Sequence, residues 1–240
     1  MTGPVLLSEP DGDGVRTLRL GRPEKANALS AGLVDAVLAA LDMLGPETRL
    51  LVVRGEGRNF CAGFDFAGHE EQSEADLLLR FVRINEVLAR LRGASFLTLA
   101  WVSGAAFGAG ADIACSCAVR LGDRTARFRF PGFQFGVALG TRRLATVVGA
   151  ERARQVLLHN EELDADTARS CGLLNDVVDA ERLDKSVDAV ARISGRLGVD
   201  ALKTLRALTD DDSADRDLAE LVRSVGRPGL HGRIAAYRKA

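Results

Sequence analysis

Two short turns rich in glycine and alanine hold the backbone groups of this sequence that are best suited to chemistry. In GEGRNFCAGFDF (residues 55–66), the Ala-Gly pair leaves the main chain around Phe64 open to a ligand. In WVSGAAFGAGADIACS (residues 101–116), three glycines do the same around Ala109. Amide N–H groups at the start of a helix have no partner inside that helix. Two such donors directed at one oxygen would form an oxyanion hole.

One acid follows the second turn. Asp112 lies in the first turn of the helix that the sequence predicts there. Its carboxylate could orient a water molecule or move a proton if it comes within about 3 Å of its target. The position also has a purely structural explanation, because the helix dipole favours an acid in the first turn by roughly 0.3–1 kcal/mol. The sequence leaves both explanations open.

Strand and helix patterns alternate around these turns. Residues 15–21 alternate as a strand, and residues 30–44 predict an amphipathic helix capped by Ser30. Residues 48–57 and 95–104 are almost uninterrupted apolar runs, each followed by a glycine-bearing loop and a helical pattern. Strands buried on both faces and separated by helices predict a parallel sheet of the α/β class.

The last part of the chain differs in pattern. From about Ala180 onward the sequence contains only helical patterns, and the acidic run DDDSAD (210–215) predicts a solvated connection between helices. We therefore expect an α/β core over residues 1–185 and a helical region over residues 186–240.

Composition excludes several classes of function. The chain has 240 residues and is 47% hydrophobic, which is enough for one sizeable core. Its 32 basic and 33 acidic residues leave a formal charge of −1, so nothing drives it toward nucleic acid or anionic lipid. The N-terminus lacks a basic segment followed by an apolar core, and no apolar run is long enough for a bilayer span. We expect a cytoplasmic protein with neither nucleic-acid nor membrane partners.

The four cysteines are expected to be reduced thiols, since disulfide frameworks belong to shorter secreted chains. They are Cys61, Cys115, Cys117 and Cys171. Only one residue separates Cys115 from Cys117 and no histidine is near them in sequence, so we expect no metal site.

Four segments, in this order and spacing, resemble the enoyl-CoA hydratase/isomerase family, also called the crotonase superfamily. They are RPEKANALS (22–30), NFCAGFDF (59–66), VSGAAFGAGADIA (102–114) and GLLNDVVDAERL (172–183). The resemblance extends over nearly the whole chain. It implies a crotonase-like superhelix of repeated ββα units, with a C-terminal helical region that packs at subunit contacts in a homotrimer or a dimer of trimers. It also implies an acyl-CoA thioester substrate and no cofactor besides the coenzyme A of that substrate.

The resemblance also assigns roles to individual residues. The amides of Phe64 and Ala109 match the family's oxyanion hole for the thioester oxygen. The residues that match the stretches along the coenzyme A are Lys25, Ala26, Ala28, Asp65, Phe66 and Ala67. Family members usually have glycine where this chain has Ala109. Alanine keeps the N–H group, so we expect the hole to survive.

The acids depart from the family pattern. Hydratases of the family typically use two glutamates, but the first position is Asp112 here, and Pro131-Gly132 replaces the second. Hydration of a 2-enoyl-CoA or a double-bond shift is the predicted reaction, with decarboxylation and thioester hydrolysis left open. A member that binds acyl-CoA or partner subunits without catalysis also remains open, as does a ligand other than a CoA ester.

The remaining polar candidates have simpler explanations. We expect His69 to be an exposed residue at a helix entry, and His159 and His231 to lie at helix ends or interfaces. Four arginines could reach phosphates, but a solvated helix face is the simpler expectation for Arg142, Arg143, Arg152 and Arg154.

Four phenylalanines alternate with other residues between positions 128 and 135. They are Phe128, Phe130, Phe133 and Phe135, and this spacing predicts one face of a strand. Glycine in place of the glutamate among these rings makes the site roomier and more apolar, which suggests a bulky or ring-bearing acyl group.

Overall fold

The computed structural model describes residues 4–209 and 213–239. Nine strands are described: β1 (Val5–Leu7), β2 (Val15–Leu20), β3 (Leu50–Gly55), β4 (Leu97–Val102), β5 (Ala105–Phe107), β6 (Val119–Gly122), β7 (Arg127–Arg129), β8 (Leu163–Asp164) and β9 (Asp176–Val177). The α-helices of the described residues are α1 (Ala31–Asp42), α2 (Glu74–Arg92), α3 (Ala109–Ser116), α4 (Thr141–Val148), α5 (Ala150–His159), α6 (Ala165–Ser170), α7 (Leu183–Thr209), α8 (Ala214–Val225) and α9 (Leu230–Lys239). Short 3-10 helices are η1 (Pro23–Lys25), η2 (His69–Glu71), η3 (Pro131–Phe135) and η4 (Ala180–Arg182).

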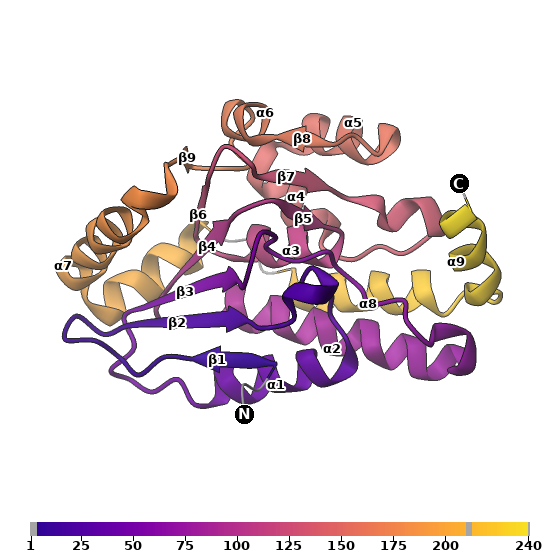
Figure 1. Cartoon of the computed structure of the whole chain (residues 1–240), viewed down its shortest axis with the longest axis horizontal. Helices are drawn as coiled ribbons and strands as arrows, with labels where there is room; N and C mark the ends of the chain where they lie inside the picture. Colours follow the sequence, from indigo (N-terminus) through magenta and orange to yellow (C-terminus); the bar gives the residue numbers. More distant parts are fainter. Residues whose placement is uncertain (1–3, 210–212, 240) are drawn as a thin grey trace.

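The strands form two sheets (Figure 1). The larger has the order β1-β2-β3-β4-β6-β9, in which β2, β3, β4, β6 and β9 run parallel and β1 is antiparallel. The smaller has the order β5-β7-β8. The parallel sheet and its crossover helices confirm the predicted α/β class.

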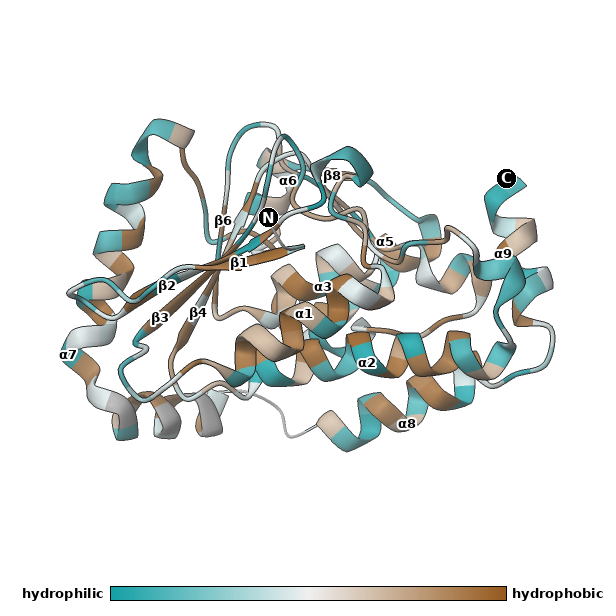
Figure 2. Cartoon of the chain, turned by 60° about the horizontal axis from the view of Figure 1, so that its bottom comes forward, coloured by the Kyte–Doolittle hydropathy of each residue, from teal (hydrophilic) through white to brown (hydrophobic). Residues whose placement is uncertain are grey.

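The central strands are apolar throughout because helices cover both faces of the larger sheet (Figure 2). Leu50 and Val52 of β3 pack in a cluster with Leu183 and Ala191 of α7. The alternate residues of the same strand belong to the main core, together with buried side chains of α1, α2 and α3. Because successive side chains of a strand point to opposite faces of the sheet, each apolar strand contributes side chains to two separate cores.

Helix starts follow their sequence signals. The Ser30 hydroxyl accepts a hydrogen bond from the Leu33 N–H and begins α1, as predicted. Ser73 and Asp76 form a capping box at the start of α2. The α-helix predicted after the second turn is α3, and Asp112 lies in its first turn.

After position 180 every secondary-structure element among the described residues is a helix, as the sequence pattern predicts. α7 is interrupted at Gly198, whose φ of 64° is not helical. α8 is tied to α2 by an ion pair of 3.1 Å between Asp217 and Arg92. Of the acidic run at 210–215, residues 210–212 lie outside the described residues. Across 4–209 and 213–239, no helix is both long and apolar enough to cross a membrane.

The fold brings the two glycine-bearing turns together. Cys61 pairs with Ala106 in an isolated parallel bridge, and α3 begins directly beyond β5. A Cβ built on Gly110 would lie 2.1 Å from the Cys61 carbonyl oxygen. Only glycine therefore allows the first turn of α3 to approach the first loop this closely.

We predict that Gly110→Ala lowers the free energy of unfolding by about 1–3 kcal/mol, because the added methyl group must push apart two backbone segments. Denaturant unfolding measures this change. The control is Gly32→Ala in α1, where a built Cβ has no neighbour within 4 Å. This variant should gain about 0.5–1 kcal/mol. Equal effects of the two substitutions would contradict the close approach.

Candidate functional site

A cavity of about 130 Å³ opens where the two turns meet. Phe64, Ala109 and Asp112 all line it, so the fold brings the three predicted chemical positions together. Much of the wall is aromatic, and these rings come from the first loop, β5, α2, α9, and η3 with the residue before it. Its rings are Phe64, Phe66, Phe81, Phe107, Phe130, Phe133, Phe135 and Tyr237. Seven of the ten phenylalanines of the chain thus face one cavity.

The backbone of Phe64 is positioned by a short parallel bridge with Leu29. The Leu29 N–H donates to the Gly63 carbonyl at 2.7 Å, and the Asp65 N–H donates to the Leu29 carbonyl at 3.2 Å. Phe64 lies between these two hydrogen bonds, so its own N–H and C=O point away from Leu29. Within the described residues, the Phe64 N–H donates to no protein acceptor.

The Ala109 amide is the first N–H of α3. Gly108, whose φ is 52°, is the N-cap residue and has no capping side chain. Residues 105–107 belong to β5, so Ala109 has no carbonyl of a preceding helical turn to bond. No hydrogen bond from this N–H occurs among the residues that the structure describes.

The two amides belong to segments in direct contact. A Cβ built on Gly63 would lie 3.3 Å from the Ala109 nitrogen and 2.4 Å from the Phe107 carbonyl oxygen. Gly63 has a φ of 88°, which other residues rarely adopt. Its missing side chain leaves space between the two turns, so two residues with unbonded N–H groups line the cavity from adjacent segments.

Asp112 lies three residues after Ala109 and therefore on the same side of α3. Its side chain is 4% exposed, and no described residue donates a hydrogen bond to its carboxylate. Burial raises the pKa of the Asp112 carboxyl well above its ordinary value of 3.8. A carboxylate whose pKa is raised in this way is a stronger base than a solvated one.

The helix dipole of α3 does not account for this environment. A dipole-stabilised surface acid would be solvated, whereas Asp112 is enclosed between α3 and the start of α4. A Cβ built on Gly140, the N-cap residue of α4, would lie 2.1 Å from Asp112 Oδ1. The fold keeps this position free of a side chain and gives the space to the carboxylate.

The position of the missing glutamate cannot hold one in this backbone. A Cβ built on Gly132 would lie 2.7 Å from the Val137 carbonyl oxygen, and the Val137 N–H donates to the Gly132 carbonyl at 2.9 Å. The tight turn therefore excludes a side chain at residue 132. Asp112 is the one carboxylate among the described residues that line the cavity.

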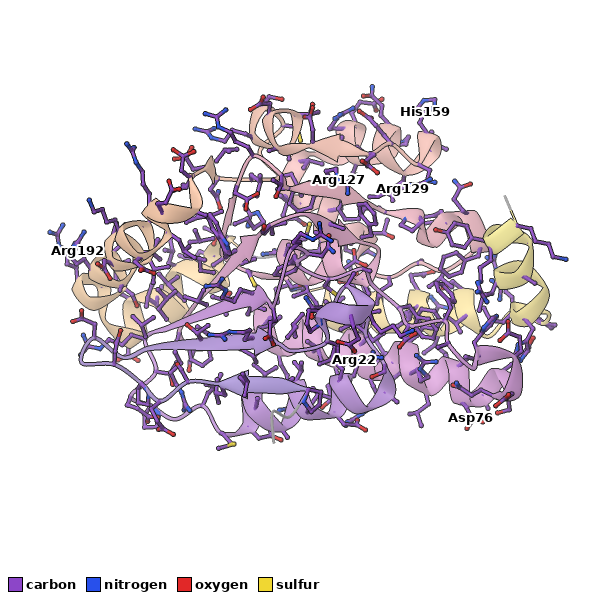
Figure 3. All side chains as sticks on the ribbon, viewed as in Figure 1. Arg22, Asp76, Arg127, Arg129, His159 and Arg192 are labelled. Atoms are coloured by element: carbon purple, nitrogen blue, oxygen red, sulfur yellow. The ribbon has the colours of Figure 1, made fainter. Side chains whose placement is uncertain are left out.

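The other charged group of the wall is Arg129, which follows Phe128 in β7 (Figure 3). Its Nε donates to Asn160 Oδ1 at 3.3 Å. Its own carbonyl accepts the Gly108 N–H at 2.8 Å, which fixes the residue before Ala109.

The segments matched to coenzyme A lie side by side. The Ala62 N–H donates to the Ala26 carbonyl at 2.9 Å. Ala28 follows Ala26 in this turn, and Lys25 ends η1 just before it. Ala26 has a φ of 47°, a strained value for a residue with a side chain.

The second of these segments is held by charge. The Asp65 carboxylate pairs with Arg22 at 2.9 Å and accepts the Ala67 N–H at 3.0 Å. Burial alone would raise the pKa of Asp65, but the Ala67 N–H and Arg22 lower it overall. Phe66 lines the cavity.

Two polar expectations are wrong. His69 is 1% exposed, because its Nδ1 lies 2.7 Å from the Phe66 carbonyl and 2.9 Å from a Glu70 oxygen in a tight 3-10 turn. Arg143 is buried and donates to the Cys115 carbonyl at 2.8 Å, so it is no solvated helix residue. A hydrogen bond compensates for the burial of each side chain, a local one within the turn for His69 and a long-range one for Arg143.

The other predicted polar residues lie away from the cavity. Arg142, Arg152 and Arg154 each form an ion pair, with Asp217, Glu161 and Glu151 respectively. His159 ends α5 at the edge of the molecule, as expected (Figure 3), and His231 lies in α9.

The predicted strand of alternating phenylalanines is also wrong. Only Phe128 lies in a strand, and residues 131–135 form the 3-10 helix η3. Pro131 ends the ladder because it has no N–H to donate. Phe128 is buried in the core, Phe133 is 48% exposed, and Phe130, Phe133 and Phe135 line the cavity.

Several residues that support the site carry no local signal. Asn27 is fully buried, and its side chain accepts from the Arg22 N–H and donates to the Glu56 and Asn59 carbonyls. Asn27 lies within the 22–30 segment that resembles the family, and this resemblance is the sequence feature that points to it. Arg80 and Tyr237 reach the site from α2 and α9, and nothing in their neighbouring residues predicts this.

The thiols do not supply a nucleophile. None of the four cysteines forms a disulfide, as expected for reduced thiols; Cys61, Cys115 and Cys117 are buried, and Cys171 is partly buried. Burial raises the pKa of Cys61 to about 12, so its thiol stays protonated at neutral pH.

Comparison with known proteins agrees with this geometry. The family model of enoyl-CoA hydratase/isomerase matches residues 11–223. A crystal structure described as an enoyl-CoA hydratase/isomerase from Bordetella parapertussis is 42% identical, covers 100% of both chains and has a TM-score of 0.96. Probable enoyl-CoA hydratase echA6 of Mycobacterium leprae is 32% identical over 85% of this chain and 82% of that protein. The 4-chlorobenzoyl coenzyme A dehalogenase-2 of an Arthrobacter species is 29% identical over 94% of this chain and 88% of that protein.

The family model covers most of the chain, and the crystal structure shares its fold from end to end. The chain therefore has the crotonase fold and belongs to the enoyl-CoA hydratase/isomerase family.

Proposed function

We propose that this protein transforms an acyl-CoA thioester through an enolate whose oxygen is held by the amides of Phe64 and Ala109. The observation that carries the proposal is the pair of unbonded N–H groups on touching segments of one cavity, beside one buried carboxylate. Chemistry next to a thioester carbonyl moves negative charge onto its oxygen. Fixed donors stabilise that charge more than they stabilise the neutral ground state, which lowers the barrier.

Asp112 is the proton-transfer group in this proposal. Hydration by two acids assigns one group to the water and another to the carbon, but the cavity offers a single carboxylate. One carboxylate suffices for a double-bond shift, because it takes a proton from one carbon and returns it two carbons along. We therefore favour isomerisation, with hydration as the alternative that the assay separates.

Coenzyme A is proposed to lie along the seam between residues 25–28 and 65–67. Hydrogen bonds that involve adjoining residues hold these segments together, from the Ala62 N–H to the Ala26 carbonyl and from the Asp65 N–H to the Leu29 carbonyl, and the 65–67 segment follows Phe64 directly in the chain. This placement puts the thioester at the two donors and directs the acyl group toward the aromatic wall.

The acyl group is proposed to carry a ring. The cavity volume is close to the roughly 150 Å³ of an apolar cavity that takes up benzene. Its walls offer aromatic faces and edges at many angles, which suit a ring better than a short polar chain.

A panel of thioesters tests the function. Purified protein is incubated with 2-enoyl-CoA and 3-enoyl-CoA esters, while conjugated-thioester absorbance, free thiol and exchange of α-protons with D₂O are followed. We expect absorbance to rise with 3-enoyl esters and α-protons to exchange. Retention on immobilised coenzyme A without either signal would show binding alone and overturn the enzymatic proposal. Thiol release as the main signal would indicate hydrolysis instead.

We predict that phenylacetyl-CoA binds at least about tenfold more tightly than butanoyl-CoA, since the ring adds stacking and apolar burial worth more than 1.4 kcal/mol. Titration calorimetry measures both affinities with the same CoA moiety as internal control. Preference for short polar acyl groups would contradict the ring-bearing assignment.

We predict that Asp112→Asn lowers turnover by at least about 10²-fold and leaves thioester affinity within a few-fold, because the amide cannot transfer the proton. Steady-state kinetics and calorimetry measure the two effects. Unchanged turnover would show that Asp112 has no catalytic role.

The same variant should be more stable than the native protein above about pH 5. The folded-state pKa of Asp112 is raised, so the folded chain binds a proton more tightly than the unfolded chain. Stability from this group is complete below its unfolded pKa and falls with rising pH, by at most about 1.4 kcal/mol per pH unit, until the folded pKa is passed. Denaturant unfolding at several pH values should show that Asp112→Asn removes this component.

A further inference from the structure

Arg80 of α2 makes an unusual set of contacts with the loop that presents the Phe64 amide. Its guanidinium carbon lies 4.0 Å from the centre of the Phe64 ring. The ring of Phe81 stacks on the same ring at 4.4 Å and an angle of 13°. Both groups are too close to the ring to share one face, so the Phe64 side chain is held between two consecutive residues of α2.

Arg80 also bonds the backbone on both sides of the Leu29–Phe64 bridge. One of its terminal nitrogens donates to the Asp65 carbonyl at 2.6 Å and lies 3.4 Å from the Leu29 carbonyl. The other donates to the Gln72 side chain at 3.3 Å. The planar guanidinium thus contacts the carbonyl of Leu29, which is the bridge partner, the ring of Phe64 and the carbonyl of Asp65.

A second arginine anchors the same segment from the other end. Arg22 pairs with the Asp65 carboxylate at 2.9 Å and donates to the Ala28 carbonyl at 2.6 Å (Figure 3 labels Arg22). Asp65 is therefore held through its side chain by Arg22 and through its carbonyl by Arg80. The Gly63 carbonyl, which shares a peptide unit with the Phe64 N–H, accepts the Leu29 N–H at 2.7 Å. The two arginines hold the residues that flank this peptide, Leu29 across the bridge and Asp65 after Phe64, through charged hydrogen bonds.

We propose that Arg80 is a positioning residue that fixes the direction of the Phe64 N–H for the enolate oxygen. This inference rests on the proposed function, because it assumes that the Phe64 amide is one of the two donors. Arg80 does not itself contact the substrate. It acts by fixing the Phe64 ring and the Asp65 carbonyl, so that the Phe64 N–H already points in the required direction when negative charge develops on the oxygen.

A purely structural role predicts a different result from a positioning role. If Arg80 only stabilised the fold, its replacement would lower the free energy of unfolding and leave the turnover of the folded protein unchanged. A positioning residue sets kcat, because a donor displaced by about 1 Å from its productive place can cost about 10²-fold in rate. Binding of the coenzyme A moiety should be little affected in either case.

The test compares Arg80→Met with Arg83→Met. Methionine keeps an unbranched apolar stem but removes the charge and the donors. Arg83 lies three residues further along α2, where it pairs with Asp35 and Glu86 away from the cavity. For each variant we measure kcat, KM, the free energy of unfolding, and the near-ultraviolet absorbance of bound acetoacetyl-CoA, whose enolate form absorbs there.

We expect Arg80→Met to lower kcat by about 10- to 100-fold with KM within about threefold, and to reduce the enolate absorbance of the bound ester. Arg83→Met should stay within about twofold of the native protein in both readouts. Arg80→Lys keeps the charge but not the flat fork, so it should fall between the two. It also provides the test if Arg80→Met does not fold.

An Arg80 variant that folds and retains both native kcat and native enolate absorbance would overturn the positioning role. Failure of the proposed function looks different. In that case the native protein itself would neither turn over thioesters nor bind acetoacetyl-CoA as the enolate, and this inference would fall with it.

Discussion

The close contact between the 61–64 loop and the first turn of α3 is the constraint on which the candidate site depends. Gly110 allows α3 to meet the Cys61 carbonyl, and Gly63 allows the Phe64 turn to meet the Ala109 amide. Neither contact leaves room for a Cβ. Parallel strands β3 and β4 deliver both turns to the same edge of the sheet, so the register of the sheet sets the spacing of the two donors.

Burial gives the site its electrostatic character. Hydrogen-bond donors interact more strongly with developing negative charge where apolar walls exclude water, and eight aromatic rings line this cavity. The same burial raises the pKa of Asp112 and leaves its carboxylate without a partner, at a cost in stability. Residues that lower stability in order to act are expected at active sites. The positively charged Arg22 and Arg80 bond Asp65 of the loop. Their charges therefore lie outside the cavity and not on the Asp112 carboxylate.

Features that depend on local pattern could be predicted from the sequence. The apolar runs gave β3 and β4, the Ser30 cap gave the start of α1, and the glycine-rich turns gave the positions of Phe64, Ala109 and Asp112. The alternating phenylalanines misled because period-2 spacing does not reveal that Pro131 starts a 3-10 turn.

Features that depend on distant contacts could not be predicted. The Arg143 side chain is buried where it bonds the Cys115 carbonyl, which lies 28 residues earlier in the sequence. The His69 ring contacts the His231 ring of α9, although its hydrogen bond to the Phe66 carbonyl is local. Arg80 lies about fifty positions from Leu29 in sequence, and its hydrogen bond to that carbonyl spans 51 residues. Tyr237 enters the cavity from the last helix. No local spacing rule reports such contacts, because they arise when α2 and α9 pack against the loops.

A crystal structure of the protein with a bound acyl-CoA thioester tests the central claim most directly. The account predicts that the thioester oxygen lies about 2.7–3.1 Å from the amide nitrogens of both Phe64 and Ala109, with Asp112 facing the carbons beside the carbonyl. A thioester oxygen bound elsewhere, or held by only one of these amides, would contradict it.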